Sequence, residues 1–381
     1  MADNNENKVL NVPHLRFPEF SGEWNKYTIN DLATVVGGGT PDTTVKSYWG
    51  GDIQWFTPSE IGKNKYVDFS KRTITRDGLD NSSAKLLPLH TILLSSRATV
   101  GECSIASNEC TTNQGFQSLI AKQCNIDFLY YLIQTKKKDL IRNACGSTFL
   151  EISANEIRKI KVAVPVQNEQ EQIAKLLSLI DERIATQNKI IEDLKKLKSA
   201  ITDLLFHSIA DAHTIRLGKI AHITNGAGDV QDANTEHQED WYPFFDRSEE
   251  LKWFPTYSFD KEAVIYAGEG QSFYPRYYNG KFALHQRCYA ITDFASCIIP
   301  KYCYHFMNTL NSYFVRNSVG STVPSLRMDI FQKVEIRLPL IPKQQHICKI
   351  IDAFYTKLEV EQRGISILQE LKQFLLSQMF I

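Results

Sequence analysis

The strongest constraint on this chain is a segment that occurs twice, once at the end of each half. Gly146-Ser147-Thr148 begins the first copy and Gly320-Ser321-Thr322 begins the second, an offset of 320 − 146 = 174 residues that then continues without a gap. About 13 of roughly 61 aligned positions are identical, and self-similarity at a fixed period indicates a repeated structural unit. The identical pairs include Lys159 and Lys333, Pro165 and Pro339, Gln170 and Gln344, Lys198 and Lys372, and Phe206 and Phe380. The regions before the two copies differ, so one scaffold carries two different heads.

The composition is that of a soluble globular protein. With 381 residues, of which 43% are hydrophobic and 23% charged, the chain is long enough for two domains with cores of their own. No apolar run reaches membrane-spanning length, and the polar start MADNNENK does not resemble a signal peptide. We therefore expect a cytoplasmic protein that does not enter a membrane.

Charge is balanced, with 43 Lys and Arg residues against 43 Asp and Glu residues. A protein that binds DNA unaided usually carries a basic surplus. If nucleic acid is the partner, either the positive charge is concentrated on one face or another subunit supplies part of it.

The cysteines and histidines do not form a metal-binding pattern. There is no C-x-x-C pair, and His207, His213 and His222 are spaced wrongly for one site. A chain of this size without a secretory signal is not expected to carry a disulfide framework. We expect reduced, mostly buried thiols and no metal. The eight cysteines are Cys103, Cys110, Cys124, Cys145, Cys288, Cys297, Cys303 and Cys348.

Apolar residues at heptad spacing predict a long helix in each copy of the repeat. Both heptad patterns are interrupted at matching places, by Gln187 and Glu361 and again by Lys198 and Lys372. The first shared break predicts a central polar layer that fixes the register, unless both residues merely lie at the edge of the seam. The seam residues are Ile173, Leu177, Ile180, Ile184, Gln187, Ile191, Leu194, Ile347, Ile351, Phe354, Leu358, Glu361, Ile365 and Leu368.

Chain order sets the direction of these helices. The first leaves head one and delivers the chain to head two, so the second must run back if it packs on the first. We therefore predict an antiparallel coiled coil with a pseudo-twofold axis. Each helix of about 38 residues is roughly 57 Å long. That length could hold two heads one or more turns of B-DNA apart, at roughly 34–36 Å per turn.

The heads are predicted to be mixed α/β domains, which makes the fold class α+β. Short β-branched and aromatic runs alternate with Gly, Pro and Asn, which favours mostly β structure with a few helices. The heads open alike, with Ile29–Val36 before a glycine loop and Ile215–Ile223 before Asn225-Gly226. The expected boundaries are 1–152 for the first head with its N-terminal segment, 153–212 for the central repeat, 213–325 for the second head and 326–381 for the distal repeat.

Several motifs occur in a characteristic order. The chain begins with PHLRFPEFSGEW; head one contains VVGGGTPDTT, GDIQWFTPSEI, LPLHTILLSSRATVGECSIA and TTNQGFQSLI; head two contains GKIAHITNGAGD, YPFFDRSEE and YYNGKFALHQRCYAIT. PVQNEQEQIAKLLSLID and PLIPKQQHICKIIDAF begin the two helices. In this order and duplication, over nearly the whole chain, they resemble the target-recognition domains and spacer regions of type I restriction-modification specificity subunits.

The resemblance implies that each head reads one half of a split DNA site and that the paired helices set the gap. It also implies that two methyltransferase subunits dock on the repeated regions and that motor-nuclease subunits join them. Such a complex methylates adenine in double-stranded DNA and cuts foreign DNA with ATP, as a host defence. S-adenosylmethionine, ATP and magnesium are used by those partners. This chain is thus expected to be non-catalytic and to bind no cofactor.

Polar and aromatic residues of the heads are candidate DNA contacts. Arg, Lys, Gln and Asn can bridge base edges or bind phosphate, and aromatic rings can pack on sugars or bases. The candidates are Lys46, Tyr48, Gln54, Arg97 and Gln114 in head one, and Gln271, Tyr274, Arg276, His285, Gln286 and Arg287 in head two. Gln114 and Gln286 each precede a short apolar run, which suggests structural equivalence. For every candidate, a purely structural or merely exposed role is the alternative.

Other functions have less support from the sequence. Gly37-Gly38-Gly39 lacks the Lys-Ser/Thr that follows a phosphate-binding loop, so a tight turn is favoured. No methyltransferase or nuclease motif accompanies it. The alternatives are a stand-alone DNA-modifying enzyme, which would bind S-adenosylmethionine, and a scaffold whose heads bind proteins, which would not bind DNA even with a methyltransferase. A silent variant that folds but assembles poorly is a third.

Exchange of head one alone for a head from another such chain should change one half of the DNA target. The other half and the gap should stay the same, because head two and the helices are untouched. The methylated sequences before and after the exchange measure this. A change in both halves would refute independent reading.

Overall fold

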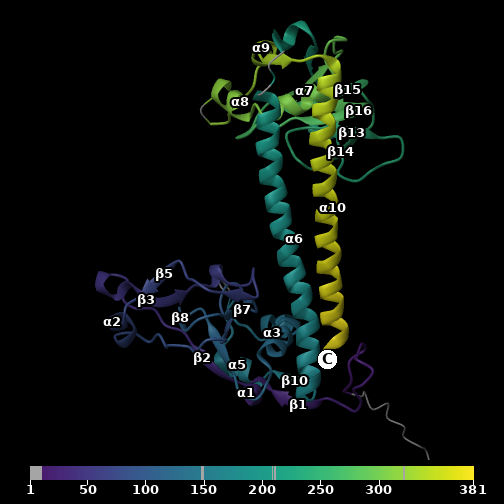
Figure 1. Ribbon diagram of the computed structural model, residues 1–381. Coiled ribbons are helices and arrows are strands. Elements are labelled where there is room, and N and C mark those ends of the chain that lie inside the picture. Colours follow the sequence, from purple (N-terminus) through teal and green to yellow (C-terminus); the bar gives the residue numbers. More distant parts are fainter. Residues whose placement is uncertain (1–10, 147–149, 208, 210–211, 321) are drawn as a thin grey trace, which may run out of the picture. The chain divides into compact units, whose positions relative to one another are not determined.

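The computed structural model describes residues 11–146, 150–207, 209, 212–320 and 322–381 (Figure 1). The chain divides into two compact units, one of Met1–Asn188 with Gly364–Ile381 and one of Lys189–Arg363. Each unit contains one head, a part of both long helices and a hydrophobic core of its own. Ser147, Thr148 and Ser321, at the predicted starts of the repeat, lie outside the described residues.

The head of the first unit combines two sheets with short helices. The five-stranded sheet has the order β2-β9-β6-β7-β4 and is antiparallel except for the pairing of β4 with β7. The three-stranded sheet has the order β5-β3-β8. The strands are β2 (Ala33–Gly37), β3 (Trp49–Phe56), β4 (Tyr66–Val67), β5 (Arg72–Ile74), β6 (Ile92–Leu94), β7 (Cys103–Ala106), β8 (Cys110–Thr112) and β9 (Gln117–Ala121). The helices are α1 (Ile29–Leu32), η1 (Lys46–Tyr48), η2 (Pro58–Glu60), α2 (Arg76–Asp80), α3 (Ile126–Thr135), α4 (Lys137–Arg142) and α5 (Ala154–Lys159).

The head of the second unit is built on one six-stranded sheet. Its order is β12-β17-β15-β16-β13-β14, antiparallel except for the pairing of β13 with β16. The strands are β12 (His222–Asn225), β13 (Tyr242–Phe245), β14 (Lys252–Phe254), β15 (Phe259–Ala267), β16 (Arg276–Leu284) and β17 (Cys288–Thr292). The helices are η3 (Leu217–Lys219), η4 (Val230–Asp232), α7 (Pro300–Met307), α8 (Asn311–Asn317) and α9 (Met328–Gln332). Both heads are therefore mixed α/β domains, as predicted.

A two-stranded antiparallel ribbon joins the start of each head to its repeat. In the first unit β1 (Asn25–Thr28) pairs with β10 (Lys161–Val164). In the second unit β11 (His213–Arg216) pairs with β18 (Glu335–Leu338). Each head thus begins and ends at the same place, beside the first turn of a long helix.

The ribbons also show which residues at the starts of the two heads are equivalent in sequence. Ile29 N donates to Ile160 O at 3.0 Å, and Leu217 N donates to Val334 O at 2.8 Å. Since Ile160 and Val334 are related by the repeat (334 − 160 = 174), Ile29 corresponds to Leu217. The expected alignment of Ile29 with Ile215 is therefore displaced by two residues.

The repeated heptads form two long helices, α6 (Gln167–His207) and α10 (Ile341–Met379). They contain 41 and 39 residues, close to the expected length. Within each unit, the parts of α6 and α10 lie side by side and run in opposite directions, as chain order predicts (Figure 1). The first unit holds the start of α6 and the end of α10, and the second unit holds the remainder.

The paired lysines that interrupt the heptads make equivalent contacts. In the first unit Lys372 Nζ lies 2.7 Å from Asp181 Oδ1 across the helix pair. In the second unit Lys198 Nζ lies 4.1 Å from the ring centroid of Tyr355. The repeat offset relates both members (372 − 198 = 355 − 181 = 174), so one helix register holds in both units.

All of the predicted seam residues are buried or half-buried. Gln187 is only 4% exposed. The Glu361 side chain is 13% exposed and forms an ion pair with Lys357 of its own helix. Because Gln187 belongs to the first unit and Glu361 to the second, the central polar layer stays a prediction.

The end of each long helix inserts a phenylalanine into a head. Phe380, after α10, stacks on Phe128 of α3 in the first unit, with ring centroids 5.2 Å apart. Phe206, near the end of α6, packs edge-on against Tyr302 of α7 in the second unit at 5.5 Å. The partners are again related by the repeat (302 − 128 = 174). Each long helix is therefore anchored by an aromatic contact where it ends.

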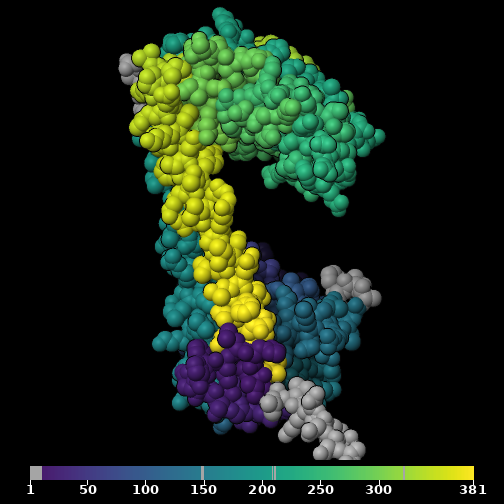
Figure 2. Space-filling model, turned by 90° about the vertical axis from the view of Figure 1, so that its right-hand side faces the viewer, coloured from purple at the N-terminus to yellow at the C-terminus, as the bar shows by residue number. Residues whose placement is uncertain are grey.

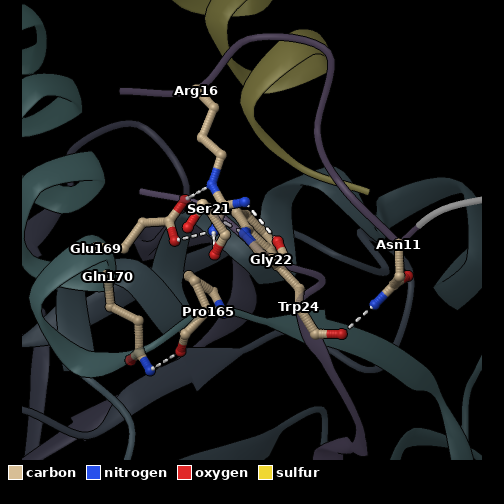
Figure 3. Close-up of polar contacts among 8 residues, drawn as sticks. All are labelled: Asn11, Arg16, Ser21, Gly22, Trp24, Pro165, Glu169 and Gln170. Carbon is tan, nitrogen blue, oxygen red and sulfur yellow. Dashed lines mark hydrogen bonds and ion pairs between the residues drawn. The ribbon is translucent and has the colours of Figure 1, made fainter. Parts of the chain in front are cut away.

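A buried glutamine fastens the start of α6 to the first head. Gln170 Nε2 donates to Pro165 O at 3.0 Å (Figure 3). Its Oε1 accepts from Asn125 N, the N-cap of α3, also at 3.0 Å. This amide therefore links the end of the ribbon, the start of a head helix and the first turn of α6.

The second unit repeats this arrangement with Gln344. Its Nε2 donates to Pro339 O at 2.9 Å and to Cys297 O at 2.8 Å, and its Oε1 accepts from Ile299 N at 2.9 Å. Gln344 is fully buried. The peptide nitrogens bound in the two units are related by the repeat (299 − 125 = 174). We call this contact the glutamine lock.

The N-terminal segment, residues 11–24, adds a clamp in the first unit. Arg16 Nε and Nη2 donate to the two oxygens of Glu169 at 2.8 and 2.7 Å, and Trp24 Nε1 donates to the same carboxylate at 3.2 Å (Figure 3). Arg16 also donates to the carbonyls of Ser21 and Gly22. Because Glu169 is fully buried, these bonds offset the cost of removing its charge from water.

Among the described residues the clamp has no counterpart in the second unit, because the repeat places an exposed Lys343 where Glu169 stands (343 − 169 = 174). The N-terminal segment also meets the end of α10, where Leu15 N donates to Gln378 O at 2.9 Å. Figure 2 shows this segment, in purple, against the yellow end of α10. The first unit thus joins residues from both ends of the sequence.

Replacement of Gln344 by Ala should lower the free energy of unfolding of the second unit by about 2–4 kcal/mol, because one N–H and two carbonyl groups lose their buried partner. Hydrogen exchange of α7 and β18 measures the local effect. Gln345→Ala, one residue further on an exposed face, is the matched control and should stay within about 0.5 kcal/mol. Equal effects of the two substitutions would contradict the lock.

Candidate DNA-recognition loops

Three loops meet at one edge of the five-stranded sheet in the first head. They follow β2, follow β6 and precede β9, and the segment after α4 joins them. The bonds between them are Gly38 N to Phe116 O at 3.4 Å, Gly39 N to Thr112 O at 2.8 Å, Ser96 N to Gly115 O at 2.8 Å and Ile152 N to Ser96 O at 2.9 Å. We call this place the loop edge of the head.

The second head has the same loop edge. Its loops follow β12, follow β15 and precede β17. The bonds are Gly226 N to Cys288 O at 3.2 Å, Gly228 N to Leu284 O at 3.0 Å, Gly268 N to Arg287 O at 2.9 Å and Leu326 N to Gly268 O at 2.7 Å. The two heads therefore share a main-chain framework although their sequences differ.

This framework aligns Gln114 with Gln286. The carbonyl groups that accept these bonds belong to Thr112 and Gly115 in head one and to Leu284 and Arg287 in head two, so equivalent residues differ by 172 in number (284 − 112 = 287 − 115 = 172). Gln114 and Gln286 differ by the same number (286 − 114 = 172). Both side chains are exposed. The equivalence suggested by the sequence is thus present in the structure.

Glycine is required in both loop edges by close approach of the main chain. A Cβ atom on Gly38 would lie 1.9 Å from Asn113 O, and one on Gly226 would lie 1.9 Å from Leu284 O. Neither glycine has a positive φ. Glycine in the loop after β2 therefore allows the main chain to pack closely against the end of β8, and it does not form a left-handed turn.

An exposed arginine lies at each loop edge, in an ion pair with a glutamate. Arg97 Nε is 3.6 Å from Glu151 Oε2, with the arginine side chain 47% exposed. Arg287 Nη1 is 2.8 Å from Glu269 Oε1. The framework places Glu269 where head one has Arg97 (269 − 97 = 172), so the two heads present their charges from different loops.

Two further candidates belong to the loop edge of head two. His285 Nδ1 accepts from Arg287 N at 3.2 Å, which fixes the imidazole beside the loop. Gln271 follows Gly270, whose N–H donates to Pro324 O at 3.0 Å. Four of the six candidates in head two therefore lie together.

The remaining candidates lie elsewhere. Gln54 Oε1 accepts from Ser70 N at 2.7 Å, so its amide is part of the β3 framework. Arg276 donates to main-chain oxygens of Asp246 and Ser248, which also gives it a structural contact. Lys46 and Tyr48 form η1, next to the three-stranded sheet, and Tyr274 is an exposed residue before β16.

One cation was missed by the sequence analysis. The Arg72 guanidinium carbon lies 3.6 Å from the ring centroid of Trp49 and 5.3 Å from that of Trp55. Arg72 pairs with Trp55 across β5 and β3, so the contact follows from strand register. No local motif in the sequence marks such a pair.

The buried cysteines have the properties of inert thiols. Burial raises the pKa of Cys103 and of Cys110 to about 12, which leaves both protonated at neutral pH. Among the described residues, no group of three or more His, Cys, Asp or Glu side chains is placed to hold a metal ion. Within the same part of the chain, no helix has the length and apolar character to cross a membrane.

Comparison with known proteins identifies the family. A sequence model of the "Type I restriction modification DNA specificity domain" matches residues 21–196 and again residues 210–373. The type I restriction enzyme MjaIX specificity subunit of Methanocaldococcus jannaschii is 28% identical, over 94% of this chain and 92% of that protein. The EcoR124I/EcoR124II specificity subunit of Escherichia coli is 28% identical over 48% of this chain and 46% of its own length.

Solved structures share the fold. The S subunit of a type I restriction-modification system from M. genitalium superposes with a TM-score of 0.63 at 18% identity, over 97% of this chain and 99% of that one. A chain from a structure of type I restriction-modification complex assembly gives a TM-score of 0.62 at 14% identity, over 96% of this chain and 99% of that one. With two matches to the family that together span most of its length, the chain belongs to the DNA specificity subunits of type I restriction-modification systems.

Proposed function

We propose that the two heads read the two halves of one split DNA sequence and that α6 and α10 together fix the gap between the halves. The observation that carries this proposal is the loop edge, where one main-chain framework presents different side chains in each head. Because the framework is shared, both heads would bind a DNA duplex in the same orientation. Different side chains give them different sequences to read.

Specificity subunits of this family are not catalytic; the methyltransferase and nuclease activities belong to other subunits of the complex. The proposal therefore includes two methyltransferase subunits and the motor-nuclease subunits as partners in the cytoplasm. S-adenosylmethionine, ATP and magnesium would be bound by those partners, and none by this chain.

Exposed apolar residues on the long helices are the proposed docking surface for the methyltransferase subunits. In the first unit Ile367, Leu371 and Phe374 of α10 are 64%, 43% and 56% exposed, at a spacing that places them on one face. In the second unit Leu197 of α6 is 49% exposed and is related to Leu371 by the repeat (371 − 197 = 174). Such a row of apolar side chains is typical of a protein interface.

The test of this function is a genome-wide map of methylated bases, by long-read sequencing, in cells with and without the gene. A split motif that disappears on deletion, and returns when the gene is restored, would support the proposal and give both half-sites and the gap. Methylation that is the same in both strains would count against it. Binding of the purified chain with its methyltransferase to random duplex DNA would then separate a silent subunit from a scaffold that does not bind DNA.

Leu371→Asp and Leu197→Asp should each weaken the binding of one methyltransferase subunit by about 30-fold, because a charge then replaces an apolar contact at an interface. Native mass spectrometry at fixed subunit concentrations should show complexes with one methyltransferase instead of two. Gln369→Asp, an exposed polar position of α10, is the control and should retain both. Complexes of unchanged stoichiometry would exclude this docking surface.

A further inference from the structure

We infer that Gln114 and Gln286 are the paired base-reading residues of the two heads. The inference rests on the proposed function, since it assigns residues to the proposed reading of DNA. Among the candidate residues, these two are the only glutamines that occupy equivalent places in both loop edges with exposed side chains. Both heads thus present an amide, which can donate and accept hydrogen bonds, at the same place of the framework, whereas the charged residues around it differ between the heads.

The amide of Gln114 is oriented by its neighbour. The Thr40 hydroxyl, on the loop after β2, donates to Gln114 Oε1. Among the described residues, Nε2 has no hydrogen-bond partner, so its two N–H groups are free to donate outward. Purine N7 and guanine O6 accept such bonds in the major groove, and adenine can pair with both ends of a glutamine amide.

Gln286 is held through its main chain. Its N–H donates to Gly228 O at 3.1 Å, and its carbonyl accepts from Asn225 Nδ2, also at 3.1 Å. The peptide is fixed on both sides while the side chain projects from it. Such a rigid support for a reading side chain lowers the entropy lost on binding.

An arginine lies beside each glutamine. It provides local positive charge in a chain whose net charge is zero. The loop bonds bring Arg97 next to Gly115, the neighbour of Gln114, and Arg287 directly follows Gln286. Both arginine side chains are largely exposed, 47% for Arg97 and 66% for Arg287, so each guanidinium can reach a DNA phosphate or guanine from its place beside the glutamine. Each loop edge therefore combines a base-reading amide with a cation.

The experiment uses the full chain expressed with its methyltransferase, with variants Gln114→Ala and Gln286→Ala. Methylated sites are mapped by long-read sequencing, and binding is measured to duplexes with single base-pair changes. We expect Gln114→Ala to relax one half-site, with discrimination at the affected position falling about 5- to 150-fold, and the other half-site and the gap to stay unchanged. Gln286→Ala should do the same to the opposite half-site.

Gln123→Ala and Gln238→Ala are the matched controls. Gln123 is exposed beyond the far end of β9, and Gln238 is exposed before the start of β13, so both lie away from the loop edges. Their target sequences should be those of the unchanged chain. A loss of discrimination as large as that of the loop variants would overturn the inference.

Gln114→Glu and Gln286→Glu keep the size of the side chain and remove its donor. If the inference holds, the preferred base at the affected position changes toward one that presents a donor, such as cytosine with its N4 amino group. Co-purification with the methyltransferase separates misfolding from a reading defect. A split motif in the unchanged chain, with every base requirement retained in assembled variants, overturns this inference alone. Absence of any split motif, together with no binding of the unchanged chain and its methyltransferase to duplex DNA, overturns the proposed function itself.

Discussion

A buried glutamine amide ties each head to the long helix that leaves it. In both units it binds the peptide at the start of a head helix and the carbonyl of the proline that ends the ribbon. Because the amide is buried, all of these groups must be satisfied at once, and the geometry of the joint is fixed. Heads with unrelated loops can therefore be carried on the same scaffold without a change in how they are attached.

The scaffold is the part of this fold that the sequence predicts well. One offset, read from identities such as Gln170 and Gln344, predicts the two helices, and chain order predicts their opposite directions. The offset extends further than the identities do, since Phe128 and Tyr302 are equivalent in packing although they differ in type. The duplicated sequence predicts the structure here because residues at equivalent positions of the two copies make the same buried contacts.

Contacts made once, between distant segments, leave no such trace. Arg16 and Glu169 are separated by 153 positions, and in the part of the chain that the structure describes the second copy has no counterpart of their ion pair, because Lys343 stands at the position of Glu169. The candidate site shows the same limit. Gln54 and Gln114 were both candidate DNA contacts from the sequence. In the structure the Gln54 amide accepts a hydrogen bond from Ser70 N beside β3, whereas Gln114 is exposed on a loop. The difference depends on hydrogen bonds between loops that are far apart in the chain.

The composition of the first unit has a consequence for biosynthesis. The second unit, Lys189–Arg363, is continuous, whereas the first needs Gly364–Ile381 as well as Met1–Asn188. Trp24 and Phe128 therefore receive the ring of Phe380 only after the last turn of α10 has left the ribosome. A chain that stops early keeps a finished second head and an open core in the first. The aromatic core of the first unit is therefore complete only when translation has reached the end of α10.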